Sequence, residues 1–165
     1  MTGLTSTTTP YHLTTLYAPI AGTTLELEKV NDVVFSENLV GVGVAIVPDR
    51  DNETEVLAPA DGVIVNILPG SHAFFMKTDD GVELLVHFGL GTVKQEGKGF
   101  TRIAGIGQQV TRGEPVLRVD TRLLEENDIN STTPVVIMSP ELYDMKVITG
   151  GVSAGVSPLI HLHRR

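Results

Sequence analysis

Short hydrophobic runs alternate with turn-forming residues along most of the chain. From about residue 16 onward, runs of four to eight residues rich in Val, Ile and Leu are separated by Gly, Pro, Asp and Asn. The clearest runs cover residues 42–47, 62–68, 82–88, 115–119 and 134–138. This spacing is typical of an all-β sandwich or barrel. We therefore predict an antiparallel β-sandwich, or a barrel-sandwich hybrid, with one or two very short helices.

Two segments carry the signals of short helices. Residues 120–127 begin with Asp120, a good N-cap residue, and continue with acidic residues. A second helical turn is predicted over residues 140–145, where Pro140 suits the first helical position and Ser139 the cap.

The chain has the organisation of one domain behind a leader. Residues 1–15 are polar and Thr-rich, which predicts a flexible leader, and residues 16–165 have no linker or change in composition. The segment 16–22 resembles 57–62, and 110–113 resembles 152–155. These echoes indicate similar turns reused in a partly symmetric sandwich; chance similarity of turn chemistry is the alternative.

Composition narrows the possible partners and chemistry. The chain has 165 residues with a formal net charge of -8, which argues against nucleic acid and anionic membrane surfaces as general partners. It has no Cys, so disulfides, thiolate metal sites and cysteine nucleophiles are excluded. We expect neither a transmembrane helix nor a signal peptide, because no apolar stretch is long enough and no basic region precedes an apolar one. A cytoplasmic location without membrane insertion follows as the expectation.

The five histidines are the main candidates for chemistry. His12 lies in the predicted leader, and His161 and His163 share one face of a predicted strand near the C-terminus. That spacing suits a metal, but an exposed strand end is the simpler interpretation. His72 and His87 differ, because they flank the hairpin signal formed by residues 73–78, a turn at 79–81 and the alternating run 82–88.

Hairpin geometry predicts that His72 and His87 lie side by side. A two-residue turn at either 79–80 or 80–81 places them opposite or diagonal on one face, with Cβ atoms about 5–8 Å apart. A three-residue turn without a bulge would place them on opposite faces. Alternation directs Val82, Leu84, Val86 and Phe88 inward, and we expect the outer face to carry the histidines together with Phe74, Met76 and Leu85.

A histidine pair on a sheet has three possible roles. It can be structural, it can bind a metal, or it can do acid–base and nucleophilic work. A zinc site needs a third ligand, for which only Glu83, His161 and His163 are available, and none is compelling. We therefore predict no metal site.

Short motifs follow one another in a fixed order over residues 16 to 162. They are Ala18-Pro19 with Gly22, DVVFSE at 32–37, LVGVGVAI at 39–46, APADG at 58–62, SHAF at 71–74, GVELLVHFG at 81–89, GKGF at 97–100 and TPVVI at 133–137. In this order and spacing they resemble the glucose-type enzyme IIA domain of the bacterial phosphoenolpyruvate:sugar phosphotransferase system.

The resemblance implies a role for each histidine. His87 corresponds to the phosphoryl acceptor and His72 to its supporting partner, with no cofactor required. The resemblance implies a phosphotransferase component that accepts phosphate from the carrier HPr and passes it to a IIB domain of a sugar permease. Val42, Phe74, Met76 and Leu85 are then the expected partner contacts around the pair. The alternative is a regulatory protein-binding module of the same fold with little phosphoryl flux.

Three positions depart from the family pattern. Val42 and Gly91 stand where the family usually has Asp, and Gly70 stands two residues before the supporting histidine, where Thr is common. Loss of two acidic groups near the acceptor would reduce charge repulsion with a phosphoryl group. We therefore expect a relatively stable phosphorylated form.

Overall fold

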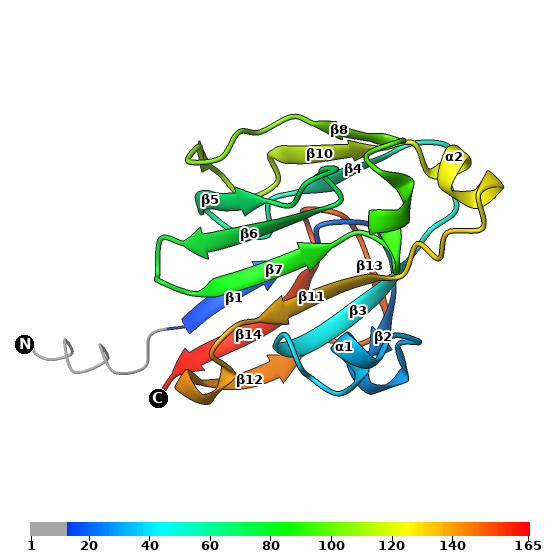
Figure 1. Cartoon of the computed structure of the whole chain (residues 1–165). Helices are drawn as coiled ribbons and strands as arrows, with labels where there is room; N and C mark the ends of the chain where they lie inside the picture. The colour runs from blue at the N-terminus through cyan, green and yellow to red at the C-terminus, as the bar shows by residue number, and fades with distance from the viewer. Residues whose placement is uncertain (1–12) are drawn as a thin grey trace, which may run out of the picture.

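The computed structural model describes residues 13–165, and most of its regular structure is β-strand (Figure 1). Every strand pair is antiparallel, which confirms the predicted fold class. The strands are β1 Leu13–Tyr17, β2 Gly22–Glu26, β3 Val42–Pro48, β4 Thr54–Leu57, β5 Gly62–Ile67, β6 Ala73–Thr78, β7 Glu83–His87, β8 Phe100–Arg102, β9 Gln109–Val110, β10 Pro115–Val119, β11 Thr133–Ile137, β12 Tyr143–Val147, β13 Gly151–Val152 and β14 Pro158–Arg164.

The strands form one large sheet and two small ones. The large sheet has eight strands in the order β13-β2-β3-β11-β7-β6-β5-β9. The small sheets have the orders β1-β14-β12 and β4-β10-β8, and in Figure 1 they lie below and above the middle of the large sheet. This arrangement encloses one face of the large sheet.

Helical segments are short, as the sequence predicted. They are η2 Leu27–Lys29, α1 Val33–Ser36, η3 Thr92–Gln95, α2 Thr121–Glu126 and η4 Pro140–Leu142. The predicted helix at 120–127 is confirmed as α2, and the carboxylate of Asp120 accepts a hydrogen bond from the backbone N–H of Leu123. The helical turn predicted over residues 140–145 is found only over η4, because residues 143–145 belong to β12. The predicted cap is wrong, because Ser139 has a left-handed backbone and its side chain makes no capping bond.

The predicted boundary of the leader shifts toward the N-terminus. Residues 13–15, which the sequence assigned to the leader, belong to β1 and pair with β14. Thr14 is buried, and the hydroxyl of Thr15 is 2.9 Å from Nδ1 of His161. Residues 1–12, including His12, lie outside the described residues.

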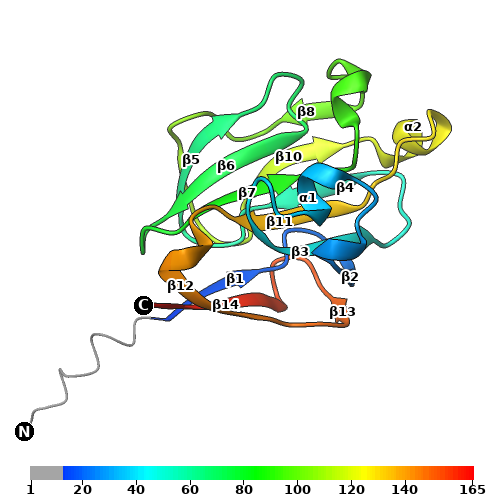
Figure 2. The same ribbon diagram turned by 60° about the horizontal axis from the view of Figure 1, so that its bottom comes forward.

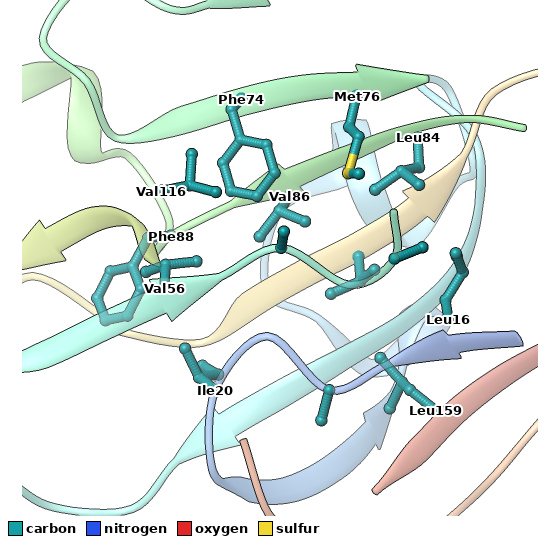
Figure 3. Close-up of a cluster of buried hydrophobic side chains, with 14 of the residues drawn as sticks. Leu16, Ile20, Val56, Phe74, Met76, Leu84, Val86, Phe88, Val116 and Leu159 are labelled. Carbon is teal, nitrogen blue, oxygen red and sulfur yellow. The ribbon is translucent and has the colours of Figure 1, made fainter. Parts of the chain in front are cut away.

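The main core fills the space between the large sheet and the two small ones (Figure 3). Side chains at alternating positions of β6 and β7 point into it, among them Phe74, Met76, Leu84 and Val86. The inward direction predicted for Val82, Leu84, Val86 and Phe88 is therefore confirmed, since each is at most 1% exposed.

A second, smaller cluster covers the outer face of the large sheet. The segment with η2 and α1 supplies Leu27, Val30 and Phe35, which pack on Ala45, Ala73, Leu85 and Val136. In Figure 2 this blue segment lies in front of β3 and β11. The outer face is thus partly buried, and the candidate histidines lie at the edge of this cover.

The two sequence echoes coincide with a local symmetry. The backbone N–H of Tyr17 donates to the carbonyl of Pro59, and that of Leu57 donates to Pro19. In the second echo the N–H of Gly113 donates to Ala58, and that of Gly155 donates to Ala18. The repeated turns therefore make equivalent hydrogen bonds, which favours symmetric reuse over chance similarity.

Candidate functional site

His87 is the last residue of β7 and points to the outer face of the large sheet. Leu84 and Val86 point into the main core, so Leu85 and His87 point the other way. Leu85 is covered by the second cluster, whereas His87 stays partly exposed at the end of the strand.

The hairpin before His87 does not have the register that the sequence analysis assumed. Ala73 pairs with His87 and Lys77 with Glu83, which leaves a three-residue turn at 79–81 with no bulge between β6 and β7. Strand alternation in this register would place His72 and His87 on opposite faces. The argument from turn length was therefore wrong.

The two imidazoles nevertheless lie together. Their ring centroids are 4.8 Å apart, with the planes at 77°. His72 precedes the first residue of β6 and follows Gly70 and Ser71, both with positive φ, so the alternation of a regular strand does not fix its direction. The predicted juxtaposition is found, but it arises from the turn before β6.

One hydrogen bond determines which nitrogen of His87 is free. Nδ1 of His87 lies 2.8 Å from the carbonyl oxygen of Gly89. A carbonyl only accepts, so Nδ1 must carry the proton and donate. In the neutral ring, Nε2 then holds the lone pair and is the nitrogen available as a nucleophile or base.

The loop that carries this carbonyl is held by its neighbours. Gly89 has φ +80°, a left-handed conformation that favours glycine. The next residue, Leu90, donates its backbone N–H to the carbonyl of Asn130 at 2.8 Å. The position of the Gly89 carbonyl is thus fixed from outside the site.

Apolar surroundings keep both rings neutral near pH 7. Burial, and then the charge of His87, lower the pKa of His72 from 6.5 to about 4. Burial also lowers the pKa of His87, although the hydrogen bond to Gly89 and the charge of Asp32 oppose this shift. Phe35 lies edge-on to His87 with centroids 5.2 Å apart, and Phe100 flanks His72 at 6.1 Å.

The sequence analysis gave no site role to Asp32 and Phe35. Asp32 is the N-cap of α1, where its carboxylate accepts the backbone N–H of Val34 at 3.0 Å. The capping pattern was readable from the sequence. The placement of Asp32 beside His87 could not be predicted from the sequence, because it depends on how residues 27–40 cross the sheet. Asp32 therefore supplies one acidic group close enough to the His87 ring to affect its pKa.

Three predicted partner contacts are in the wrong place. Phe74 is 0% exposed and Met76 1% exposed, both in the main core, and Leu85 is 3% exposed beneath the second cluster. The three-residue turn sends Phe74 and Met76 to the face opposite His87, and Figure 3 shows both in the main core. Side chains buried in this way offer no contact area to a partner.

Val42 is also misplaced by the sequence analysis. It pairs with Ile137, which is in the main core, whereas Gly43 pairs with Val136, which is in the outer cluster with Leu85. Paired residues share a face, so Val42 and His87 belong to opposite faces of the sheet. An acidic residue at position 42 would not face His87. Gly91 remains relevant, because it lies in the loop four residues after His87.

His161 and His163 are not part of the site. His161 and His163 belong to β14, in a different sheet, and Glu83 is at the far end of β7 from His87. Within residues 13–165 there is no group of three or more His, Asp and Glu side chains placed to hold a metal ion. The same residues contain no helix long and apolar enough to cross a membrane.

The geometry assigns two roles to the histidine pair. A neutral His87 offers Nε2 to an electrophile, and a neutral His72 beside it has one N–H to donate to oxygen atoms of that electrophile. The phenylalanines limit access of water to both rings.

Comparisons with known proteins find the same kind of domain. The family described as phosphoenolpyruvate-dependent sugar phosphotransferase system, EIIA 1, matches residues 14–143. The glucose-specific EIIA component of Haemophilus influenzae is 45% identical over 150 residues, which cover 90% of this chain and 89% of that protein. The N-acetylglucosamine-specific EIICBA component of Klebsiella pneumoniae is 40% identical, and the match spans only 22% of its length.

A solved structure has a similar fold. The glucose permease IIA of Mycoplasma capricolum superposes with a TM-score of 0.81 at 31% identity, over 90% of this chain and 96% of that one.

The lowered pKa of His72 predicts a loss of stability in mild acid. Its pKa is about 4 in the folded chain and 6.5 ordinarily, so between these values the unfolded chain binds more protons. The free energy of unfolding should fall as the pH drops from about 6.5 to about 4, by up to about 3 kcal/mol. Urea unfolding across this range measures the fall, and His72→Gln should reduce it. An equal fall in His72→Gln would contradict the assignment.

Proposed function

The chain belongs to the EIIA 1 family of the phosphoenolpyruvate-dependent sugar phosphotransferase system, and from this premise we propose that it is the phosphoryl carrier of a sugar uptake system. In this proposal it works in the cytoplasm, accepts phosphate from phospho-HPr on His87, and passes it to a IIB domain of a sugar permease. The observation that carries the proposal is the pairing of His72 with a His87 whose Nδ1 is tied to the Gly89 carbonyl.

The acceptor atom in this proposal is Nε2 of His87. Its lone pair attacks the phosphorus of phospho-HPr, a P–N bond to Nε2 forms, and the P–N bond to the carrier breaks. Nδ1 keeps its proton and its hydrogen bond to the Gly89 carbonyl, so Nδ1 neither gains nor loses a proton in this step. In the second transfer the bond to Nε2 breaks, and the phosphoryl group passes to a cysteine of the IIB domain.

His72 supports the transferring group. Phosphoryl transfer depends mainly on positioning and on stabilising the charge of the equatorial oxygens. The ring centroid of His72 lies 4.8 Å from that of His87, so an N–H of His72 can donate to an oxygen of a phosphoryl group on His87. Its low pKa keeps the ring neutral, so this is the support of a hydrogen bond rather than of a full positive charge.

Exposed apolar side chains on α1, and on the segments that follow α1 and the His87 strand, provide the docking surface. On α1, which Phe35 anchors next to His87, Val33 is 55% exposed and Val34 40%. Leu39, after α1, and Val93, in η3, are 67% and 66% exposed. A net charge of -8 favours approach of a basic carrier, and such transient interfaces depend on a few apolar anchors.

The names of longer relatives support a IIB partner. This chain spans about a fifth of proteins that are named EIICBA components, of Staphylococcus carnosus and Klebsiella pneumoniae. Those names join an A part to B and C parts in one protein. We take the B part as the kind of domain that receives phosphate from His87.

We predict that His87 is the residue that carries phosphate. Incubation with phosphoenolpyruvate, enzyme I and HPr should label the wild-type chain with one acid-labile, alkali-stable phosphate, and His87→Gln should abolish the label. His72→Gln should take label at least tenfold more slowly, because glutamine keeps an N–H donor but holds it in a different position. His161→Gln, in another sheet, is the matched control. Label on His87→Gln, or no label on the wild type, would refute the proposal; the latter leaves a purely regulatory module.

We predict that Val33 is an anchor for HPr. Val33→Lys places a charge at the apolar surface and should weaken HPr binding roughly tenfold, equivalent to about 1.4 kcal/mol. Val156→Lys, at a position that is 72% exposed and far along the chain, adds the same charge as a control. Calorimetric titration with HPr measures both. Equal affinities in the two variants would remove α1 from the docking surface.

We predict that an acidic residue at position 91 destabilises the phosphorylated form. Gly91 has φ +67°, which Asp tolerates better than most residues, and a Cβ there meets nothing within 4 Å. Repulsion of about 1 kcal/mol between nearby charges should lower the ratio of phosphorylated to free chain about fivefold at fixed phospho-HPr. Gly107→Asp, with φ +85° and equally open space, is the control. A ratio unchanged in Gly91→Asp would mean that this position does not sense the phosphate.

A further inference from the structure

The imidazole of His72 is packed rather than hydrogen-bonded. Within residues 13–165 neither of its nitrogens makes a hydrogen bond, whereas Nδ1 of His87 bonds to the carbonyl of Gly89. His72 is nevertheless only 4% exposed. A hydrogen bond weakens steeply when donor and acceptor are misaligned, so a ring that donates to a transferring group has to keep one direction. Contacts with other groups must therefore set the direction of this ring.

Five aromatic rings contact one another in series through the site. Phe35 lies edge-on to His87, His87 to His72, His72 to Phe100, and Phe100 to Phe88. The centroids of successive rings are between 4.8 and 6.2 Å apart, a spacing at which edge-on aromatic pairs attract one another. His72 is the third ring of this series, so His87 and Phe100 are the rings that hold it.

Phe100 links this series to the main core. It is the first residue of β8, where it pairs with Val119 of β10. Its ring packs on the main core and lies edge-on to Phe88, which is 0% exposed. The imidazole of His72 therefore packs against a ring that the core holds in place.

The turn that carries His72 also meets the segment before Phe100. A Cβ on Gly70 would lie 3.3 Å from the backbone nitrogen of Gly97, and a Cβ on Gly97 would lie 3.4 Å from Cα of Gly70. Both glycines have positive φ, and their backbones approach with no side chain between them. The backbone N–H of Phe100 donates to the carbonyl of Gly97 at 3.2 Å. The backbone that leads to His72 is thus in contact with the turn that leads to Phe100.

We propose that Phe100 is a positioning residue, which holds the imidazole of His72 in the direction needed to donate to a phosphoryl group on His87. The ring of Phe100 acts on the imidazole, and the contact between Gly70 and Gly97 acts on the backbone that carries it. This inference rests on the proposed function, because the phosphoryl group defines the direction that His72 must keep. It gives a role to residues 97–100, one of the motifs that carry the family resemblance.

Loss of the Phe100 ring should affect His72 more than His87. Burial is the main cause of the low pKa of His72, and Phe100 contributes to this burial through its ring contact. Phe100→Leu stays apolar but loses the ring, so the pKa of His72 should rise from about 4 toward 6.5 as water gains access. The charge of His87 acts on His72, and that of Asp32 on His87; the substitution removes neither.

The first experiment compares the full wild-type chain with Phe100→Leu, Phe35→Leu and Phe75→Leu by NMR titration of the imidazole rings. Phe35 contacts His87 instead of His72, and Phe75 is a partly buried ring that, among the described residues, contacts neither histidine ring. Phe100→Leu should raise the pKa of His72 by about one unit and leave that of His87 nearly unchanged. Phe35→Leu should raise mainly the pKa of His87, and Phe75→Leu should change neither.

Transfer kinetics separate positioning from partner binding. Phe100→Leu should lower the rate of labelling at saturating phospho-HPr roughly fivefold, because the donor is misdirected, and leave the half-saturating concentration of HPr unchanged. Phe100→Tyr keeps the ring and should restore both the rate and the pKa of His72.

A backbone variant tests the same proposal without touching the Phe100 ring. Gly70→Ala adds a methyl group 3.3 Å from the nitrogen of Gly97 and 3.6 Å from Nδ1 of His72, whereas Gly81→Ala has the same φ of +91° and open space. The two variants carry the same backbone strain. Gly70→Ala should therefore label at least twofold more slowly than Gly81→Ala at saturating phospho-HPr.

Different results overturn different claims. A Phe100→Leu chain with the wild-type pKa of His72, or with the wild-type saturating rate, would show that Phe100 only fills space. If Phe100→Leu does not fold, equal rates in Gly70→Ala and Gly81→Ala would refute the proposal. A wild-type chain that takes no phosphate would instead refute the proposed function. The pKa comparison needs no phosphate, so it still decides whether Phe100 acts on His72.

Discussion

The hydrogen bond between Nδ1 of His87 and the carbonyl of Gly89 is the constraint on which the site depends. It fixes the tautomer of the neutral His87 ring and so leaves the lone pair on Nε2. The fold supplies the carbonyl by ending β7 at His87 and holding the following loop against Asn130. Without this bond the same two imidazoles would lie together with no preference for the attacking nitrogen.

One face of the large sheet packs in the main core, and the other carries the candidate site. The inner face fills the main core, whereas the outer face is only partly covered by residues 27–40 and leaves His87 at the edge of that cover. Burial there lowers the pKa of both histidines, while the side chain of His87 stays partly exposed. The covering segment also brings Asp32 and Phe35 to the acceptor ring, so the cover itself forms part of the site.

Local signals in the sequence predicted the strands and helices well, but not how these elements pack against one another. Residues 115–119 and the cap at Asp120 were found because short-range pattern and capping chemistry determine them. The placement of Phe74, Met76 and Leu85 failed because one residue more in the turn at 79–81 reverses the face of a whole strand, and because a distant segment buries Leu85. The histidine pair was predicted from hairpin geometry with the wrong turn length, and the family resemblance supplied only its expected roles; the backbone turn at Gly70 and Ser71 is what brings the rings together.

The tautomer of His87 is the most direct test of this account. A two-dimensional proton–nitrogen NMR spectrum of the imidazole rings at pH 7 distinguishes a protonated from an unprotonated nitrogen. The account predicts that His87 carries its proton on Nδ1 in the free chain and keeps it there after phosphorylation, when Nε2 becomes bonded to phosphorus. A proton on Nε2 of the free chain, or phosphate on Nδ1, would contradict it.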